Sequence, residues 1–424
     1  MTGNAGASLK RNLATMLLWQ VGNYLVPLAT FPYLTRTLGP SEFGVLGVAA
    51  AIAAYCGIVA EWGFNLSGPR AVVECRGRPG ALNELIWSTV SAKACLCLLS
   101  GVVLVVAFML SASLAAMKSA VFFSWLAVVG NVLTLSWLFQ GLERFSLFAT
   151  VSLAGRFLTL PLTFVFVKDS SDTAIAAAIQ AASPILTGVF SFGITWRMGL
   201  LGRPASSWRL VYERLVQGAQ TFVSTASVSL FGATNAMILG YVGGTHQVGI
   251  YAAADKLKTV GNMIPAQINT VLYPRIARLF ADDQRAAAYL TVVGASVTVT
   301  VTAAGVLFCA VLAKPLTTLV LGDKYAASAL VLQLLCLATL FGNLAYFLGL
   351  QVLVPFGEER KRSMVMLCAG CLNVVLAIVL AQRFGAVGAA AAFAIAEGVI
   401  LAAYIHSILH TARMKAHFTQ LVRG

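Results

Sequence analysis

The chain has 424 residues, of which 59% are hydrophobic and 10% are charged, and its mean hydropathy is +0.85. Soluble domains carry about one quarter charged residues, so this composition excludes a soluble globular protein and indicates an integral membrane protein. The formal net charge of +14 favours cytoplasmic loops that contact anionic headgroups over nucleic-acid binding, because the rest of the chain is so apolar.

The first predicted span follows a polar N-terminus that ends in Lys10-Arg11. Its apolar segment is too long for the core of a signal peptide, contains Pro27 and Pro32, and shows no small-residue cleavage site. We therefore expect a membrane-spanning helix that is retained in the protein.

Hydrophobic runs predict an all-α membrane protein with twelve spans, since about 20 apolar residues cross the hydrocarbon core of a bilayer. The spans are expected at residues 13–36, 43–67, 85–110, 119–140, 147–167, 173–196, 216–241, 248–272, 288–312, 327–353, 363–382 and 386–409.

Lys and Arg residues are distributed unequally between the two sides of this topology. The N-terminus, the loops after even-numbered spans and the C-terminal tail hold 19 of the 29 basic residues. Cytoplasmic loops are enriched in Lys and Arg, so both termini are predicted to be cytoplasmic.

A polar connection, Met198 to Tyr212, divides the chain nearly in half after the sixth span. We expect two six-helix lobes, residues 1–206 and 207–424. Because six is even, the lobes insert with the same orientation, which predicts a pseudo-two-fold axis along the membrane normal and a cleft between the lobes. This is the architecture of an alternating-access transporter.

A weak internal repeat supports the two lobes. The segment from Leu38 to Arg70 resembles the segment from Val242 to Arg275, with four identical pairs that lie 205 positions apart: Gly44 and Gly249, Ala49 and Ala254, Pro69 and Pro274, Arg70 and Arg275. Each copy predicts a glycine turn at one membrane face, a crossing helix, and a Pro-Arg stop at the other face.

Ionisable residues inside the spans are the candidate functional residues, because each costs about 2.5–3.5 kcal/mol in a bilayer unless it faces protein or a watery cavity. The candidates for substrate or cavity contact are Arg156, Lys93, Lys256, Lys258 and, at the outer end of the first span, Arg36. The candidates for ion coupling or gating are Glu397, Asp255 and Glu61.

Several of these residues have structural alternatives. Asp255 and Lys258 are three positions apart on one helix face and are suited to neutralise each other. Glu61 and Lys93 are suited to snorkel or to pair locally. Arg156 has no opposite charge within its own span, so its partner is expected on another helix or on the substrate.

Other polar residues indicate structural roles. Asn131, Asn235, Asn343 and Gln180 are expected to form hydrogen bonds between helices. His406 and His410 are one turn apart, which suits a metal, but no carboxylate lies near them, so interfacial histidines are favoured. The eight cysteines show no zinc-site spacing, and no nucleotide-binding or catalytic constellation is present. We therefore expect no metal, no cofactor and no enzymatic activity.

Several segments resemble the polysaccharide-exporter branch of the multidrug/oligosaccharidyl-lipid/polysaccharide superfamily, the O-antigen (Wzx-type) flippases. The resemblance lies in Pro32-Tyr33-Leu34 with Leu38 to Gly44, in Trp62 to Ser67, in Trp137 to Arg144 and in Val248 to Lys256.

This resemblance implies a MATE-like fold of twelve helices in two lobes. It also implies that the protein moves an undecaprenyl-diphosphate-linked oligosaccharide, for O-antigen, capsule or exopolysaccharide, across the bacterial inner membrane. The implied partners are that lipid-linked glycan, membrane lipids and the polysaccharide polymerase machinery.

Two alternatives remain open from the sequence. The first is an ion-coupled multidrug or cation antiporter of the same superfamily, which is expected to present carboxylates to organic cations. The second is a membrane glycosyltransferase or polymerase, which is expected to carry large outer loops with catalytic groups; the loops here are short.

Overall fold

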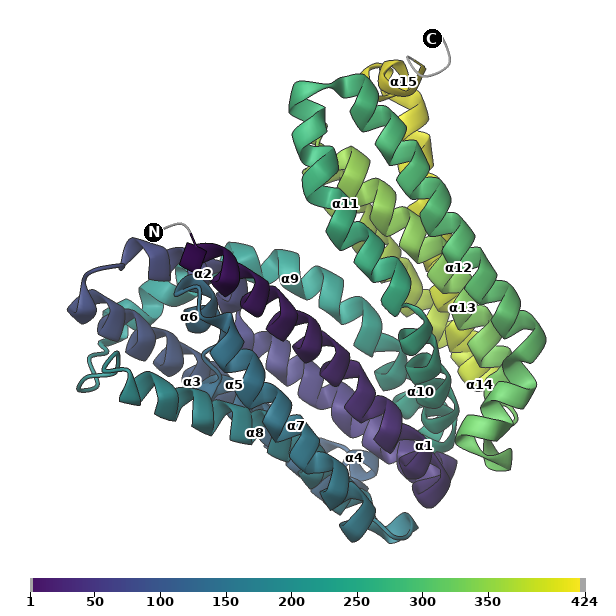
Figure 1. Cartoon of the computed structure of the whole chain (residues 1–424). Helices are drawn as coiled ribbons and strands as arrows, with labels where there is room; N and C mark the ends of the chain where they lie inside the picture. The colour runs from purple at the N-terminus through teal and green to yellow at the C-terminus, as the bar shows by residue number, and fades with distance from the viewer. Residues whose placement is uncertain (1–2, 420–424) are drawn as a thin grey trace. The chain divides into compact units, whose positions relative to one another are not determined.

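The computed structural model describes residues 3–419, and every regular element in that range is helical (Figure 1). The helices are α1 (Gly3–Glu61), α2 (Phe64–Glu74), α3 (Pro79–Leu110), α4 (Ala112–Ala116), α5 (Lys118–Leu133), α6 (Ser136–Gly141), α7 (Phe145–Phe166), α8 (Thr173–Arg197), α9 (Trp208–Val242), α10 (Gly244–Gly261), α11 (Met263–Asp282), α12 (Gln284–Leu321), α13 (Ser328–Leu348), α14 (Glu359–His410) and α15 (Ala412–Thr419). Short 3-10 turns lie at Ser170–Asp172 and Asp323–Tyr325, and a π-helical turn lies at Gly349–Leu353.

Within the described range, eight helical stretches are long and apolar enough to cross a membrane. Their most apolar windows are only 11–44% buried inside the protein. On α3, for example, Leu98, Val102, Val105 and Met109 are exposed. Apolar surface on this scale is stable only against hydrocarbon, so the protein is a multi-pass membrane protein.

Two of these stretches contain two crossings each. A straight helix of 52 residues, the length of α14, extends about 78 Å, which is more than twice the hydrocarbon core of about 30 Å. The backbone leaves helical geometry at Gly39 in α1 and at Gly385 in α14, where φ is +74° and +55°. Counting both halves of α1 and α14, and adding α9 and the α10–α11 segment, gives the twelve predicted crossings.

The chain forms two compact units, Met1–Ala233 and Thr234–Gly424. The boundary between them lies inside α9. The lobe boundary expected at residues 206 and 207 stays a prediction.

The first unit contains a close crossing of α5 and α8. A Cβ atom on Gly130 would lie 2.5 Å from the backbone of Pro184 and Ile185, and one on Gly188 would lie 2.5 Å from the Gly130 carbonyl oxygen. The two helix backbones are therefore in contact, which small residues alone allow. This crossing fixes the spacing of the helices that surround the pocket described below.

In the second unit, α13 packs against α10, α12 and α14. The Asn343 side chain donates to Asn262 Oδ1 at 2.7 Å, and the Asn235 side chain donates to the Tyr251 hydroxyl at 3.2 Å. Asn373 in turn donates to Asn235 Oδ1 at 3.1 Å. The prediction of interhelical hydrogen bonds is therefore confirmed for Asn235 and Asn343.

The glycine turns of the internal repeat are confirmed. Gly39 and Gly244 lie 205 positions apart and adopt φ angles of +74° and +77°. Such angles are strained for residues with a Cβ atom, so glycine is required at the same point of both copies.

The predicted Pro-Arg stops are wrong. Pro69 lies inside α2 and Pro274 inside α11, and both helices continue beyond them. Packing against neighbouring helices compensates for the hydrogen bond that proline removes, as it commonly does in membrane helices. The crossing helices break earlier, after Glu61 and at Asn262.

Candidate functional site

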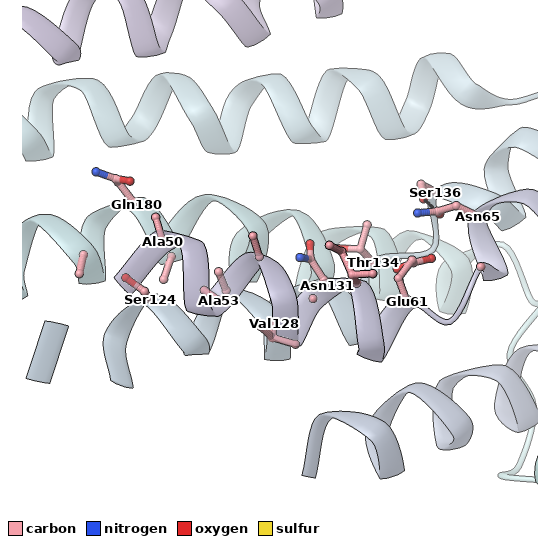
Figure 2. A pocket seen from close by; sticks show the side chains of 17 residues that line it. Ala50, Ala53, Glu61, Asn65, Ser124, Val128, Asn131, Thr134, Ser136 and Gln180 are labelled. Carbon is pink, nitrogen blue, oxygen red and sulfur yellow. Dashed lines mark hydrogen bonds between the residues drawn. The ribbon is translucent and has the colours of Figure 1, made fainter. Parts of the chain in front are cut away.

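An open pocket of about 560 Å³ lies within the first unit. Its walls come from the second half of α1, the start of α2, and helices α5, α6 and α8. Figure 2 shows Gln180 and Ser124 at one end, Asn131 and Ala53 in the middle, and Glu61 with Ser136 at the other end. The α1 wall runs from Ala50 to Glu61, a rise of about 16 Å, so the pocket is elongated.

Small residues make the α1 wall. Ala50, Ala53, Ala54 and Gly57 all line the pocket. A Cβ atom on Gly57 would meet no other atom within 4 Å. This wall therefore leaves open volume that larger side chains would fill.

The pocket ends where α1 breaks. Trp62 adopts φ +46°, which is rare for a bulky residue, and Gly63 adopts φ +77°. The Trp62 indole donates to the Leu215 carbonyl at 2.8 Å and stacks on Phe222 with ring centroids 4.2 Å apart. These contacts with α9 hold the break directly after Glu61.

Glu61 and Lys93 form a buried ion pair at this end of the pocket. Lys93 Nζ lies 2.8 Å from Glu61 Oε2 and donates to the Asn131 carbonyl oxygen at 3.0 Å. The Lys93 side chain is 2% exposed and the Glu61 side chain 21% exposed. Glu61 Oε1 is buried and has no hydrogen-bond partner among the described residues.

Three more side chains bring unused hydrogen-bonding groups to the pocket: Ser124, Asn131 and Gln180. Their side-chain polar atoms form no hydrogen bond within the part of the chain that the structure describes. The prediction of interhelical hydrogen bonds is therefore wrong for Asn131 and Gln180, because both side chains face a cavity. Sequence reasoning missed them as pocket residues, although a polar amide in an apolar span was the available signal.

Arg156 lies in the middle of α7, is half-buried, and is not among the residues that line the pocket. No acidic side chain pairs with it in the described part of the protein. Its role as a substrate contact stays a prediction.

The basic candidates on α10 differ in exposure. Lys258 Nζ lies 2.6 Å from Asp255 Oδ1 and 5.2 Å from the centre of the Phe393 ring, so this pair is the local neutralisation that the spacing allows. Lys256 is exposed. Arg36, in α1, is exposed and has an interaction partner within the protein.

Glu397, in the second half of α14, faces α13. A Cβ atom on Gly342 would lie 2.9 Å from Glu397 Oε2. Lys258 is close enough to interact with this carboxylate electrostatically, although its ion pair is with Asp255.

The residues that the structure describes contain no group of three His, Cys, Asp or Glu side chains arranged to hold a metal. The rings of His406 and His410 stack with centroids 3.9 Å apart, and His410 Nδ1 lies 3.0 Å from the His406 carbonyl oxygen.

Solved structures with the same fold include a lipid flippase and a multidrug resistance transporter. "Lipid II flippase MurJ, inward closed conformation" superposes with a TM-score of 0.72 at 11% identity and covers 96% of this chain and 91% of its own. An inward-facing multidrug resistance MATE family transporter of the MOP superfamily has a TM-score of 0.66 at 15% identity, covering 94% and 96%. At these identities the likeness shows the fold alone, and it confirms the predicted fold class.

The sequence comparisons are more specific. A protein of Escherichia coli strain K12 named "Putative O-antigen transporter" is 29% identical over 388 residues, which are 90% of this chain and 92% of the relative. A family model described as "Polysaccharide biosynthesis protein" matches residues 9–280. That match covers well over half of the chain, so this multi-pass membrane protein belongs to the polysaccharide biosynthesis protein family.

Proposed function

We propose that the protein is a flippase that moves an undecaprenyl-diphosphate-linked oligosaccharide from the cytoplasmic to the periplasmic leaflet of a bacterial inner membrane. The observation that carries this proposal is the similarity to the relative named "Putative O-antigen transporter" along 90% of the chain, within a polysaccharide biosynthesis family. The relatives are named transporters and flippases, which disfavours a glycosyltransferase or polymerase.

The physical problem matches the architecture. A glycan head cannot cross hydrocarbon because its hydroxyl groups would lose their hydrogen bonds to water, whereas a polyprenyl tail is stable there. A flippase therefore needs a polar chamber for the head and lipid contact for the tail. The elongated pocket of the first unit supplies polar groups next to helices whose apolar faces are exposed.

Alternating access provides the movement. In the proposed cycle the pocket opens to the cytoplasm, receives the glycan head, and then opens to the periplasm when the two lobes rock. With both termini cytoplasmic, the basic loops contact the anionic inner leaflet. Energy enters from the substrate gradient or from an ion whose binding involves Glu61, Asp255 or Glu397.

Arg156 is proposed to contact the diphosphate. Guanidinium groups bind phosphate oxygens through paired hydrogen bonds, and this half-buried arginine has no acidic partner in the described chain.

The test is deletion of the gene followed by leaflet-specific detection of the lipid-linked glycan. We expect the glycan to accumulate on the cytoplasmic side and surface polysaccharide to be lost, with recovery from a plasmid copy. Normal surface polysaccharide would contradict the proposal, and drug sensitivity without glycan accumulation would indicate an antiporter instead.

A further inference from the structure

Lys93 contacts two residues that line the pocket, Glu61 and Asn131, and its charge is already neutralised. Its ammonium group contacts Glu61 Oε2 at 2.8 Å and the Asn131 carbonyl oxygen at 3.0 Å, and its side chain is 2% exposed. An anionic ligand that bound Lys93 would have to break this pair. The Glu61 carboxylate would then lie unpaired beside the negative charge of the ligand, which is strongly unfavourable. The pocket therefore presents a neutral pair to whatever enters it.

The remaining lining groups are uncharged donors and acceptors. The Ser124 hydroxyl and the Asn131 and Gln180 amides form no hydrogen bond within the described residues. Glu61 Oε1 is a buried acceptor that lacks a donor. The Asn131 and Gln180 side chains are exposed and can bind a ligand without losing a bond within the described chain, whereas Glu61 Oε1 is costly without a donor, so this pocket is suited to a ligand that supplies hydroxyl or amide hydrogens.

We infer that this pocket is a subsite for uncharged sugar residues of the glycan and not for its diphosphate. The inference rests on the proposed function and names the part of the substrate that the first unit holds. Glu61 Oε1 accepts a sugar O–H, and the amides of Asn131 and Gln180 each offer both a donor and an acceptor. The alanines and Gly57 on α1 leave room for the sugar rings, and the length of about 16 Å suits a chain of them.

Gly57 provides a direct test. A side chain there projects into open space, because a Cβ atom meets nothing within 4 Å. Gly57→Leu should therefore place its side chain in the pocket, starting from a Cβ position that is free of other atoms. Gly193→Leu is the matched control: Gly193 lies inside α8, its Cβ position is equally open, and it does not line the pocket. Both changes replace a helical glycine with a better helix former.

The measurement is binding to the purified protein in lipid nanodiscs, with two probes. One is undecaprenyl diphosphate that carries the cell's own glycan unit, and the other is sugar-free undecaprenyl diphosphate. We expect Gly57→Leu to weaken binding of the glycan-bearing lipid at least tenfold and to change binding of the sugar-free lipid less than twofold. Gly193→Leu should change both less than twofold.

Equal weakening of both lipids by Gly57→Leu would place the diphosphate in the pocket and overturn the inference, as would no weakening of either. Ala53→Leu, one turn earlier on the same wall, repeats the test if the first variant does not fold. A wild-type protein that binds neither lipid would instead contradict the proposed function itself.

Discussion

Among the described residues, each unit has an ion pair inside a predicted span, and the two pairs differ in how they are built. Glu61 and Lys93 come from different helices, α1 and α3, and Lys93 is 2% exposed. Asp255 and Lys258 lie three positions apart on α10, and their side chains are 35% and 16% exposed. The first pair connects two helices beside a pocket, whereas the second is local to one helix.

This difference teaches that charge within a membrane span does not by itself identify a free binding group. A buried interhelical pair is costly to break because the remaining charge stays buried. A partly exposed ion pair on one helix contributes little to stability, because water or lipid headgroups compensate the charge of each partner. The following changes separate the two cases, in order of decreasing effect on stability.

Lys93→Met should have the largest effect. It leaves the Glu61 carboxylate unpaired in a site where one of its oxygens already lacks a partner, and we expect a loss of about 3–5 kcal/mol. Thermal unfolding of the purified protein in detergent, followed by tryptophan fluorescence, measures this loss of stability. Lys256→Met, at an exposed lysine, is the control and should change stability by less than about 0.5 kcal/mol.

An unchanged unfolding temperature for Lys93→Met would show that Glu61 reaches solvent without its partner. The pair would then resemble the one on α10, and the contrast between the two units would disappear.

The double variant Glu61→Gln with Lys93→Met should recover most of this loss. Neither charge remains, and neutral replacements of buried pairs are often close to neutral in stability, so we expect a deficit within about 1–2 kcal/mol of the wild type. A double variant as unstable as Lys93→Met would show that the aliphatic and amide replacements do not fit the site.

Lys258→Met should cost much less. The ion pair with Asp255 contributes about 0.2–1 kcal/mol at this exposure, and the contact of Lys258 with the Phe393 ring adds about 0.5–1 kcal/mol. The same unfolding measurement compares it directly with Lys93→Met. Equal losses of stability in Lys93→Met and Lys258→Met would show that the surroundings of α10 exclude water as fully as those of α3.

The same contrast explains what the sequence revealed. The Asp255–Lys258 pair follows from spacing on one helix, and the twelve crossings follow from hydropathy. The pairing of Glu61 with Lys93 depends on how α1 and α3 are placed against each other, which local patterns do not encode. The sequence therefore identified both residues as unusual but left their relation open.

Two other features depend on tertiary contacts in the same way. An amide in an apolar span has the same pattern whether it faces a helix, as Asn235 does, or a cavity, as Asn131 does. The break after Glu61 requires Trp62 at φ +46°, a conformation that contacts with Leu215 and Phe222 on distant α9 impose. Nothing near Trp62 in the sequence predicts it.

Glu397→Gln should have the smallest effect on stability and decides whether this carboxylate has a coupling role. Glutamine keeps the shape that packs against Gly342, and Lys258 keeps Asp255 as its ion-pair partner, so we expect a change below about 1 kcal/mol. The substitution removes a titratable carboxylate, so if Glu397 carries the coupling ion, as proposed, glycan transport in inverted vesicles should lose its dependence on pH or sodium. Glu359→Gln, at the exposed start of the same helix, should retain it. An unaltered dependence on pH or sodium in Glu397→Gln would exclude this residue from coupling. Of the two remaining candidates, Glu61 would then be stronger than Asp255, because Glu61 has an unpartnered oxygen at a pocket.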